Sequence, residues 1–219
     1  MSKQELLYSD VPDYADSSGF FTGGFGNNYG RRLPTSVMKL FERGFPWASI
    51  GSGKGRFEWW LKYKQGVDVT CVDPDPKAYG SGDVIVEPEF PTVKKLISAR
   101  PDVVGEMATL LLWPSPNSGD GFGTAEADSD DEEESKVAYD MDAIQRLRPP
   151  VVVIMYAACG ASGSEDLLYW LYSHDGYTVL LRDECPVYRG GFIGTVAYEL
   201  LVLGRNDWDR FDEVKEIFA

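Results

Sequence analysis

Three glycines at alternate positions, and a carboxylate that follows the first of them by 22 residues, are the groups in this chain best placed to do chemistry. Gly51, Gly53 and Gly55 follow one short apolar run, and Asp73 follows the next. Glycine lets a backbone approach a ligand closely and adopt positive φ, and a helix starting at Gly55 would point free N–H groups at the same place. A carboxylate at a strand tip can accept both hydroxyls of a ribose. Together these residues predict a site for a ribose-bearing ligand.

The glycine turn departs from two other nucleotide-binding patterns. A phosphate-binding loop has Ser or Thr after its lysine and begins with glycine, whereas Gly55 follows Lys54 and Ala48 holds the leading position. The dinucleotide fingerprint has Gly or Ala where Arg56 stands, because the helix must lie close to the strand there. The pattern therefore disfavours ATP or GTP hydrolysis and leaves a nicotinamide-linked oxidoreductase as a lesser alternative.

The elements that position these residues alternate between strands and helices. Apolar and β-branched runs predict seven strands, at residues 47–50, 67–72, 84–86, 107–112, 151–156, 177–181 and 195–203. Apolar residues at helical spacing predict helices between most of these strands, but not between the last two. We expect a Rossmann-like, doubly wound α/β fold: a seven-stranded, mostly parallel sheet with an antiparallel last strand and helices on both faces. Ligands of such sheets bind beyond the carboxyl ends of the strands, where the strand order reverses.

From residue 45 to residue 204 the chain resembles the class I methyltransferases, which depend on S-adenosylmethionine. The first motif of that family is a strand that leads into Gly-x-Gly-x-Gly, matched here by residues 49–55, and Asp73 holds the position of its ribose acid. The resemblance implies S-adenosylmethionine as the cofactor. It also implies the cofactor-binding residues Ser49, Gly51, Ser52, Gly53, Asp73, Pro74 and Trp113.

Two departures from the family bear on the chemistry. Ser49 stands where the family usually has Asp or Glu, two residues before the first glycine. At the end of the fourth strand, members that methylate amines have Asp or Asn, then Pro-Pro and an aromatic residue, whereas this chain has Trp113-Pro114-Ser115-Pro116. An indole nitrogen only donates a hydrogen bond, so Trp113 cannot accept one from a nucleobase amine. It can instead form an aromatic wall against adenine, a flat substrate or the methylsulfonium.

The candidate catalytic residues are Trp113, Pro114 and Tyr156, which lie at the ends of the fourth and fifth predicted strands. The single histidine, His174, follows an apolar helix and is typical of a helix C-terminus. Proton transfer would therefore fall to Tyr156, Asp183 or Glu184, and their spacing does not select one.

Composition limits the partners and the compartment. The net charge is −14, and eight of the acidic residues lie in a loop at 117–135, which could attract a basic protein partner. Basic residues form only short clusters, which disfavours nucleic acid as a substrate. The three cysteines form no CxxC pair, and no apolar run is long enough to span a membrane. We expect a soluble, cytoplasmic protein that binds no metal and no membrane.

The sequence divides into a Gly-rich and aromatic leader at 1–34, a methyltransferase-like domain at 35–205, and a C-terminal helix or tail at 206–219. The function expected from the resemblance is methyl transfer to an unidentified acceptor, with a small molecule or a protein favoured over nucleic acid. The alternative is a methyltransferase-like binding or scaffold protein that has lost catalysis. Turnover on any acceptor would separate the two.

Overall fold

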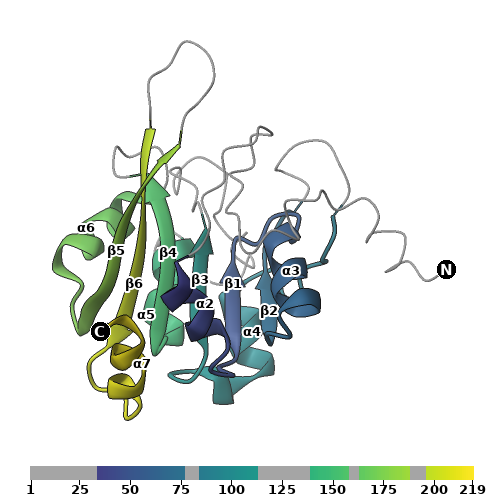
Figure 1. Cartoon of the computed structure of the whole chain (residues 1–219). Helices are drawn as coiled ribbons and strands as arrows, with labels where there is room; N and C mark the ends of the chain where they lie inside the picture. The colour runs from purple at the N-terminus through teal and green to yellow at the C-terminus, as the bar shows by residue number, and fades with distance from the viewer. Residues whose placement is uncertain (1–33, 77–83, 113–138, 158–162, 188–195) are drawn as a thin grey trace.

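The computed structural model describes residues 34–76, 84–112, 139–157, 163–187 and 196–219 (Figure 1). The 117–135 loop, Trp113, Pro114, Cys159 and all of the leader except Pro34 lie outside the described residues. The strands are β1 (Trp47–Ile50), β2 (Val69–Val72), β3 (Ala108–Leu112), β4 (Val151–Ala157), β5 (Tyr177–Val187) and β6 (Val196–Arg205). The helices are α2 (Thr35–Phe41), α3 (Arg56–Lys64), α4 (Val93–Ala99), α5 (Tyr139–Leu147), α6 (Glu165–Ser173) and α7 (Phe211–Phe218), with a 3₁₀ turn at Pro101–Val103.

The strands form one sheet in the order β2-β1-β3-β4-β6-β5. The first four are parallel to one another, and β6 lies antiparallel between β4 and β5. The chain moves outward from β1 to β2 and then returns to the other side of β1 as β3, so the strand order reverses at β1. This confirms the Rossmann-like, doubly wound fold with an antiparallel last strand. It also places the turn after β1 at the position where such sheets bind ligands.

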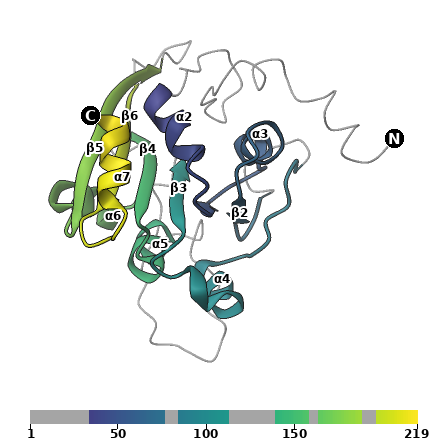
Figure 2. The same cartoon turned by 60° about the horizontal axis from the view of Figure 1, so that its bottom comes forward.

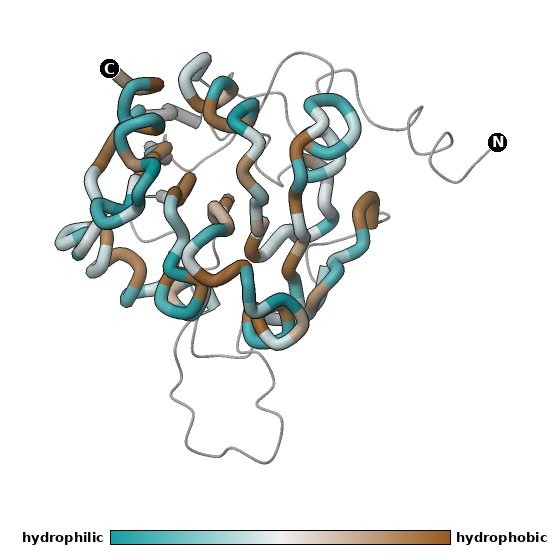
Figure 3. Tube along the Cα trace, turned by 90° about the horizontal axis from the view of Figure 1, so that it is seen from below, coloured by the Kyte–Doolittle hydropathy of each residue, from teal (hydrophilic) through white to brown (hydrophobic). Residues whose placement is uncertain are grey.

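Helices cover both faces of the sheet (Figure 2). The side chains of the strands alternate between two apolar cores, one on each face. Helices α2, α3 and α7 pack on one face, which receives Val153 and Met155 of β4. Helices α4, α5 and α6 pack on the other, which receives Val152 and Ile154. Because both faces are covered, the central strands are mostly apolar, with the buried polar residues Ser49 and Thr109 as exceptions. The surrounding helices alternate hydrophobic with hydrophilic residues (Figure 3). None of the helices in the described ranges is long and apolar enough to cross a membrane.

The predicted strand at 84–86 is wrong, and the described residues contain six strands. The backbone N–H groups of Ile85 and Val86 donate to the carbonyl of Lys54, at 2.8 and 3.3 Å. The segment that follows pairs with the edge strand β2 at one isolated parallel bridge, between Val72 and Phe90. The β-branched run therefore covers the glycine turn instead of extending the sheet, a use of such residues that local propensity cannot distinguish from a strand.

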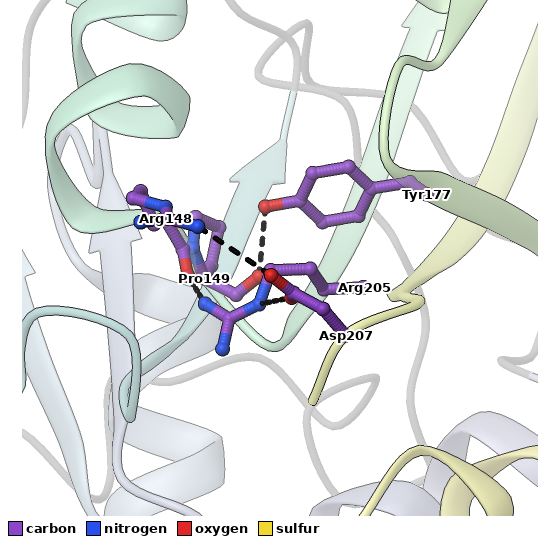
Figure 4. A network of polar contacts seen from close by, with 5 residues as sticks. All are labelled: Arg148, Pro149, Tyr177, Arg205 and Asp207. Atoms are coloured by element: carbon purple, nitrogen blue, oxygen red, sulfur yellow. Dashed lines mark hydrogen bonds and ion pairs between the residues drawn. The ribbon is translucent and has the colours of Figure 1, made fainter. Parts of the chain in front are cut away.

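The C-terminal segment carries helix α7, which packs against the sheet through buried Val214. A polar network ties the preceding turn to the start of β4 (Figure 4). The Tyr177 hydroxyl donates to the Pro149 carbonyl at 2.9 Å, and the Arg205 guanidinium donates to the Arg148 carbonyl and pairs with Asp207 at 2.7 Å. This network lies at the amino end of β4, so it supports the fold on the side opposite the glycine turn.

The close packing of Val86 on the turn predicts that Gly55→Ala is more damaging than Gly66→Ala. Both glycines have a φ near +70°, but a Cβ at Gly55 would lie 2.6 Å from the Val86 Cβ, whereas one at Gly66 would meet nothing within 4 Å. We expect Gly66→Ala to cost about 1 kcal/mol from backbone strain. Gly55→Ala should cost roughly 1–3 kcal/mol more from the overlap. Urea denaturation measures both, and equal losses would contradict this packing.

Candidate functional site

The turn between β1 and α3 has the backbone geometry expected of a ligand-binding loop. Gly51, Gly53 and Gly55 have φ of +69°, +55° and +70°, which a side chain would strain. The Gly51 N–H donates to the Val72 carbonyl at 2.8 Å, which extends the pairing of β1 with β2 by one residue. Gly55 is the N-cap residue of α3 and has no side chain to cap the helix. The turn therefore has no Cβ atom at three alternate positions on the carboxyl edge of the sheet, and the start of α3 points its backbone N–H groups there.

Asp73 is brought to this turn by the parallel register of the two strands, in which Ile50 lies opposite Val72. One carboxylate oxygen, Oδ2, accepts the Gly53 N–H at 2.7 Å, and the other, Oδ1, accepts the Asp75 N–H at 2.9 Å. Asp73 is only 3% exposed, and burial raises its pKa while the two backbone hydrogen bonds oppose the shift. Because a carboxylate has about four acceptor positions, each oxygen keeps one for a ligand hydroxyl.

Beneath the turn lies a second carboxyl group that sequence reasoning missed. The Ser49 hydroxyl is hydrogen-bonded to the Glu58 carboxyl oxygen Oε1 at 2.5 Å, and both residues are buried. Burial is the largest cause that raises the pKa of Glu58 to about 7, and the nearby Asp73 charge adds to it, while the bond to Ser49 opposes it. The sequence does contain one sign that Glu58 is buried: it lies three residues before the apolar Leu61, which is buried, and so on the same face of the helix.

Next to this pair, Cys71 is a buried thiol of β2 that packs in the core. Burial raises its pKa to about 12, so it is protonated at neutral pH and is not a nucleophile. The Ser52 hydroxyl lies beside the thiol as a hydrogen-bonding neighbour that lowers the pKa of Cys71, and it meets no other partner among the described residues. A thiol is a weak hydrogen-bonding group, so a ligand at the turn could offer this hydroxyl a stronger partner.

Helix α5 begins against the same turn. The Tyr139 ring lies over Gly51, with its Cε2 atom 3.2 Å from the position that a Cβ on Gly51 would take. The next residue, Asp140, is buried and accepts hydrogen bonds from the Ser164 N–H at 2.9 Å and from its hydroxyl at 2.7 Å. Ser164 in turn caps α6 by accepting the Leu167 N–H. Asp140 thus fixes the starts of α5 and α6, and Tyr139 limits the space above Gly51.

The structure accounts for the other predicted site residues in different ways. Tyr156, at the carboxyl end of β4, is 7% exposed and donates to the Glu199 carboxylate at 2.9 Å. Burial and this carboxylate raise the pKa of Tyr156 well above its usual value, so it keeps its proton at neutral pH. Pro74 is exposed directly after Asp73. Trp113 and Pro114 lie outside the described residues, so their roles stay predictions.

Comparison with known proteins finds likeness only among solved structures. No family model and no curated protein matches the sequence. The chain is similar to a Thermoplasma acidophilum protein at 15% identity, with a TM-score of 0.46 over 95% of this chain and 100% of that one. It is also similar to magnesium protoporphyrin IX methyltransferase from Synechocystis PCC 6803 with bound S-adenosylmethionine, at 12% identity and a TM-score of 0.42, over 93% of this chain and 79% of that one.

A third similar structure is an rRNA methylase from Streptococcus thermophilus, at 12% identity and a TM-score of 0.39, over 80% of this chain and 98% of that one. These likenesses assign no activity to the chain.

The buried Glu58 predicts an unusual dependence of stability on pH. Its pKa is about 7 in the folded protein against an ordinary value of 4.5, so the folded state holds the proton more tightly. Stability is therefore fully present below pH 4.5 and is lost by about 3 kcal/mol as pH rises through 7. Glu58→Gln removes this loss, so the variant should gain stability relative to the parent between pH 5 and 8.

Urea denaturation across that pH range measures the difference, with the exposed Glu106→Gln as the matched control. Asp73 and Asp140 are common to all three proteins, so their titration cancels. A constant difference between Glu58→Gln and the parent would contradict the buried, raised-pKa carboxyl.

Proposed function

We propose that the chain binds S-adenosylmethionine at the β1–α3 turn and transfers its methyl group to a small-molecule or protein acceptor. The observation that carries this proposal is the 2.7 Å hydrogen bond from the Gly53 N–H to the Asp73 carboxylate. It joins the Cβ-free backbone to the acid that the family resemblance assigns to the ribose. Neither group alone would distinguish a cofactor site from a tight turn beside a strand end.

The residues at the turn fit the cofactor. Asp73 retains one acceptor position on each oxygen, which suits two ribose hydroxyls. Gly51 and Gly53 place no Cβ atoms at the turn, so the backbone there could lie close to the rest of the ligand beside the Tyr139 ring, and the Ser52 hydroxyl supplies a further polar group. When bound, S-adenosylmethionine supplies a methyl group on a positively charged sulfur. The role of the chain is to hold the cofactor and the acceptor in line.

The acceptor class rests on the sequence. In Trp113-Pro114-Ser115-Pro116, Trp113 stands at the Asp or Asn position of the amine-methylating members and offers no acceptor oxygen there for a nucleobase amine, which favours a different class of acceptor. The low content of basic clusters supports the same choice.

A binding or scaffold module without catalysis is the second candidate, and one observation favours it. The tyrosine predicted to act at the carboxyl edge, Tyr156, is buried, keeps its proton and is already bonded to Glu199. The Glu199 carboxylate also lies 3.7 Å from the Arg182 guanidinium, so it interacts with both Tyr156 and Arg182. Cofactor binding without turnover on any acceptor would establish this second function.

Calorimetric titration tests the proposed site. We expect S-adenosylmethionine and S-adenosylhomocysteine to bind the parent protein, and Asp73→Asn to weaken both by about 10- to 100-fold, because a hydrogen bond to a charged group contributes roughly 1.5–3 kcal/mol. The exposed Asp68→Asn, at the other end of the same strand, is the matched control and should bind normally. Thermal unfolding verifies that both variants fold. No binding by the folded parent, or NAD competing equally well, would refute the proposal.

Trp113 provides a separate test of the predicted aromatic wall. Loss of its contact with the sulfonium in Trp113→Ala should weaken S-adenosylmethionine binding by roughly 0.5–2 kcal/mol, and Trp113→Phe should retain most of the affinity. S-adenosylhomocysteine, which lacks the positive charge, should be affected less. Equal losses for both ligands would show that Trp113 packs against an uncharged part of the cofactor.

A further inference from the structure

The position two residues before the first glycine is occupied by Ser49, yet a carboxyl group reaches this place from another element. Glu58 extends from α3 to Ser49, and the two side chains bond at 2.5 Å beneath the turn. Glu58 is 3% exposed, so it does not touch solvent or a ligand directly. The site therefore contains two buried carboxyls, Glu58 and Asp73, which lie close enough for the Asp73 charge to raise the pKa of Glu58.

Few positive charges balance this pair. Titratable and polar groups act on Glu58 both directly and through its neighbours. They lie on β1, α3, β2 and the segments after β2, and they include Ser49, Lys62, Cys71, Asp73 and Glu89. Lys62 is the one cation among these described groups, and its effect on the pKa of Glu58 is the smallest of those that act. The Lys62 ammonium already forms an ion pair with the Glu89 carboxylate at 2.7 Å, so the Glu89 charge largely balances it.

We propose that Glu58 is a specificity-determining residue that favours the positively charged S-adenosylmethionine over its uncharged-sulfur product at the glycine turn. This inference rests on the proposed function. A buried carboxyl with a hydroxyl as its hydrogen-bonding partner interacts strongly with any charge placed nearby, because the surroundings screen it weakly. The sulfonium of the substrate cofactor would stabilise the ionised form of Glu58, whereas the product has no charge on sulfur, and the amino group that both ligands share does not distinguish them. Product release is thereby favoured after each transfer.

The pH at which Glu58 titrates makes the effect measurable near neutrality. Its pKa is raised to about 7 by burial, so about half of the protein carries the proton at pH 7. If a bound sulfonium lowers this pKa by about one unit, the affinity for S-adenosylmethionine rises about fivefold from pH 6 to pH 8. At pH 7 the same coupling releases about 0.4 proton on binding.

The experiment is calorimetric titration of each ligand into the parent protein and into Glu58→Gln, at pH 6, 7 and 8, in buffers of different ionisation enthalpy. Titration of the ligand's own amino group is the same for both proteins and cancels in the comparison. We expect the fivefold rise and the extra 0.4 proton with S-adenosylmethionine in the parent alone, and little difference between the proteins with S-adenosylhomocysteine. Ser49→Ala removes the bond that stabilises ionised Glu58, so it should shift the same profile to higher pH.

The outcomes separate the two proposals. If both ligands bind but pH dependence and proton release are identical in the parent and in folded Glu58→Gln, the inference about Glu58 is overturned and the cofactor site stands. If Glu58→Gln does not fold, an unshifted profile in Ser49→Ala overturns it instead. If neither ligand binds the folded parent at any pH, the proposed function itself fails.

Discussion

The hydrogen bond from the Gly53 N–H to the Asp73 carboxylate joins the two strand ends on which the candidate site depends. It requires β1 and β2 to be parallel and in register, so that both carboxyl ends arrive at one edge of the sheet. It also requires a turn that bends back over β2, which the positive φ angles of the glycines allow. The fold supplies the first condition and the glycine spacing supplies the second.

Burial of carboxyl groups at this edge has an energetic cost that the rest of the structure offsets. Asp73 and Asp140 accept backbone hydrogen bonds, whereas Glu58 is bonded to the Ser49 hydroxyl. Burial raises the pKa of all three, so the edge is less stable when fully ionised. Such groups are typical of sites where a protein retains charge for binding, and the two apolar cores on either face provide the stability that permits it.

Much of this arrangement could be predicted from the residues, because it follows from local patterns. Alternating elements and a Gly-x-Gly-x-Gly turn predict the parallel sheet, the position of the site and the approach of Asp73. The Ser49–Glu58 pair could not be predicted in the same way, because it depends on how α3 rotates against the sheet. The 84–86 run failed as a strand for a similar reason, since its backbone hydrogen bonds go to Lys54 in a turn distant in sequence. Tertiary contacts decided both cases.

The central claim is that the Gly51–Gly53 turn and Asp73 together hold the ribose end of S-adenosylmethionine. A crystal structure of the protein with S-adenosylhomocysteine tests it most directly, because it locates the ligand without requiring turnover or a known acceptor. The account predicts both ribose hydroxyls within hydrogen-bond distance of the Asp73 carboxylate, with the ligand lying against the glycine backbone. A ligand bound elsewhere, or one whose ribose contacts neither Asp73 oxygen, would contradict it.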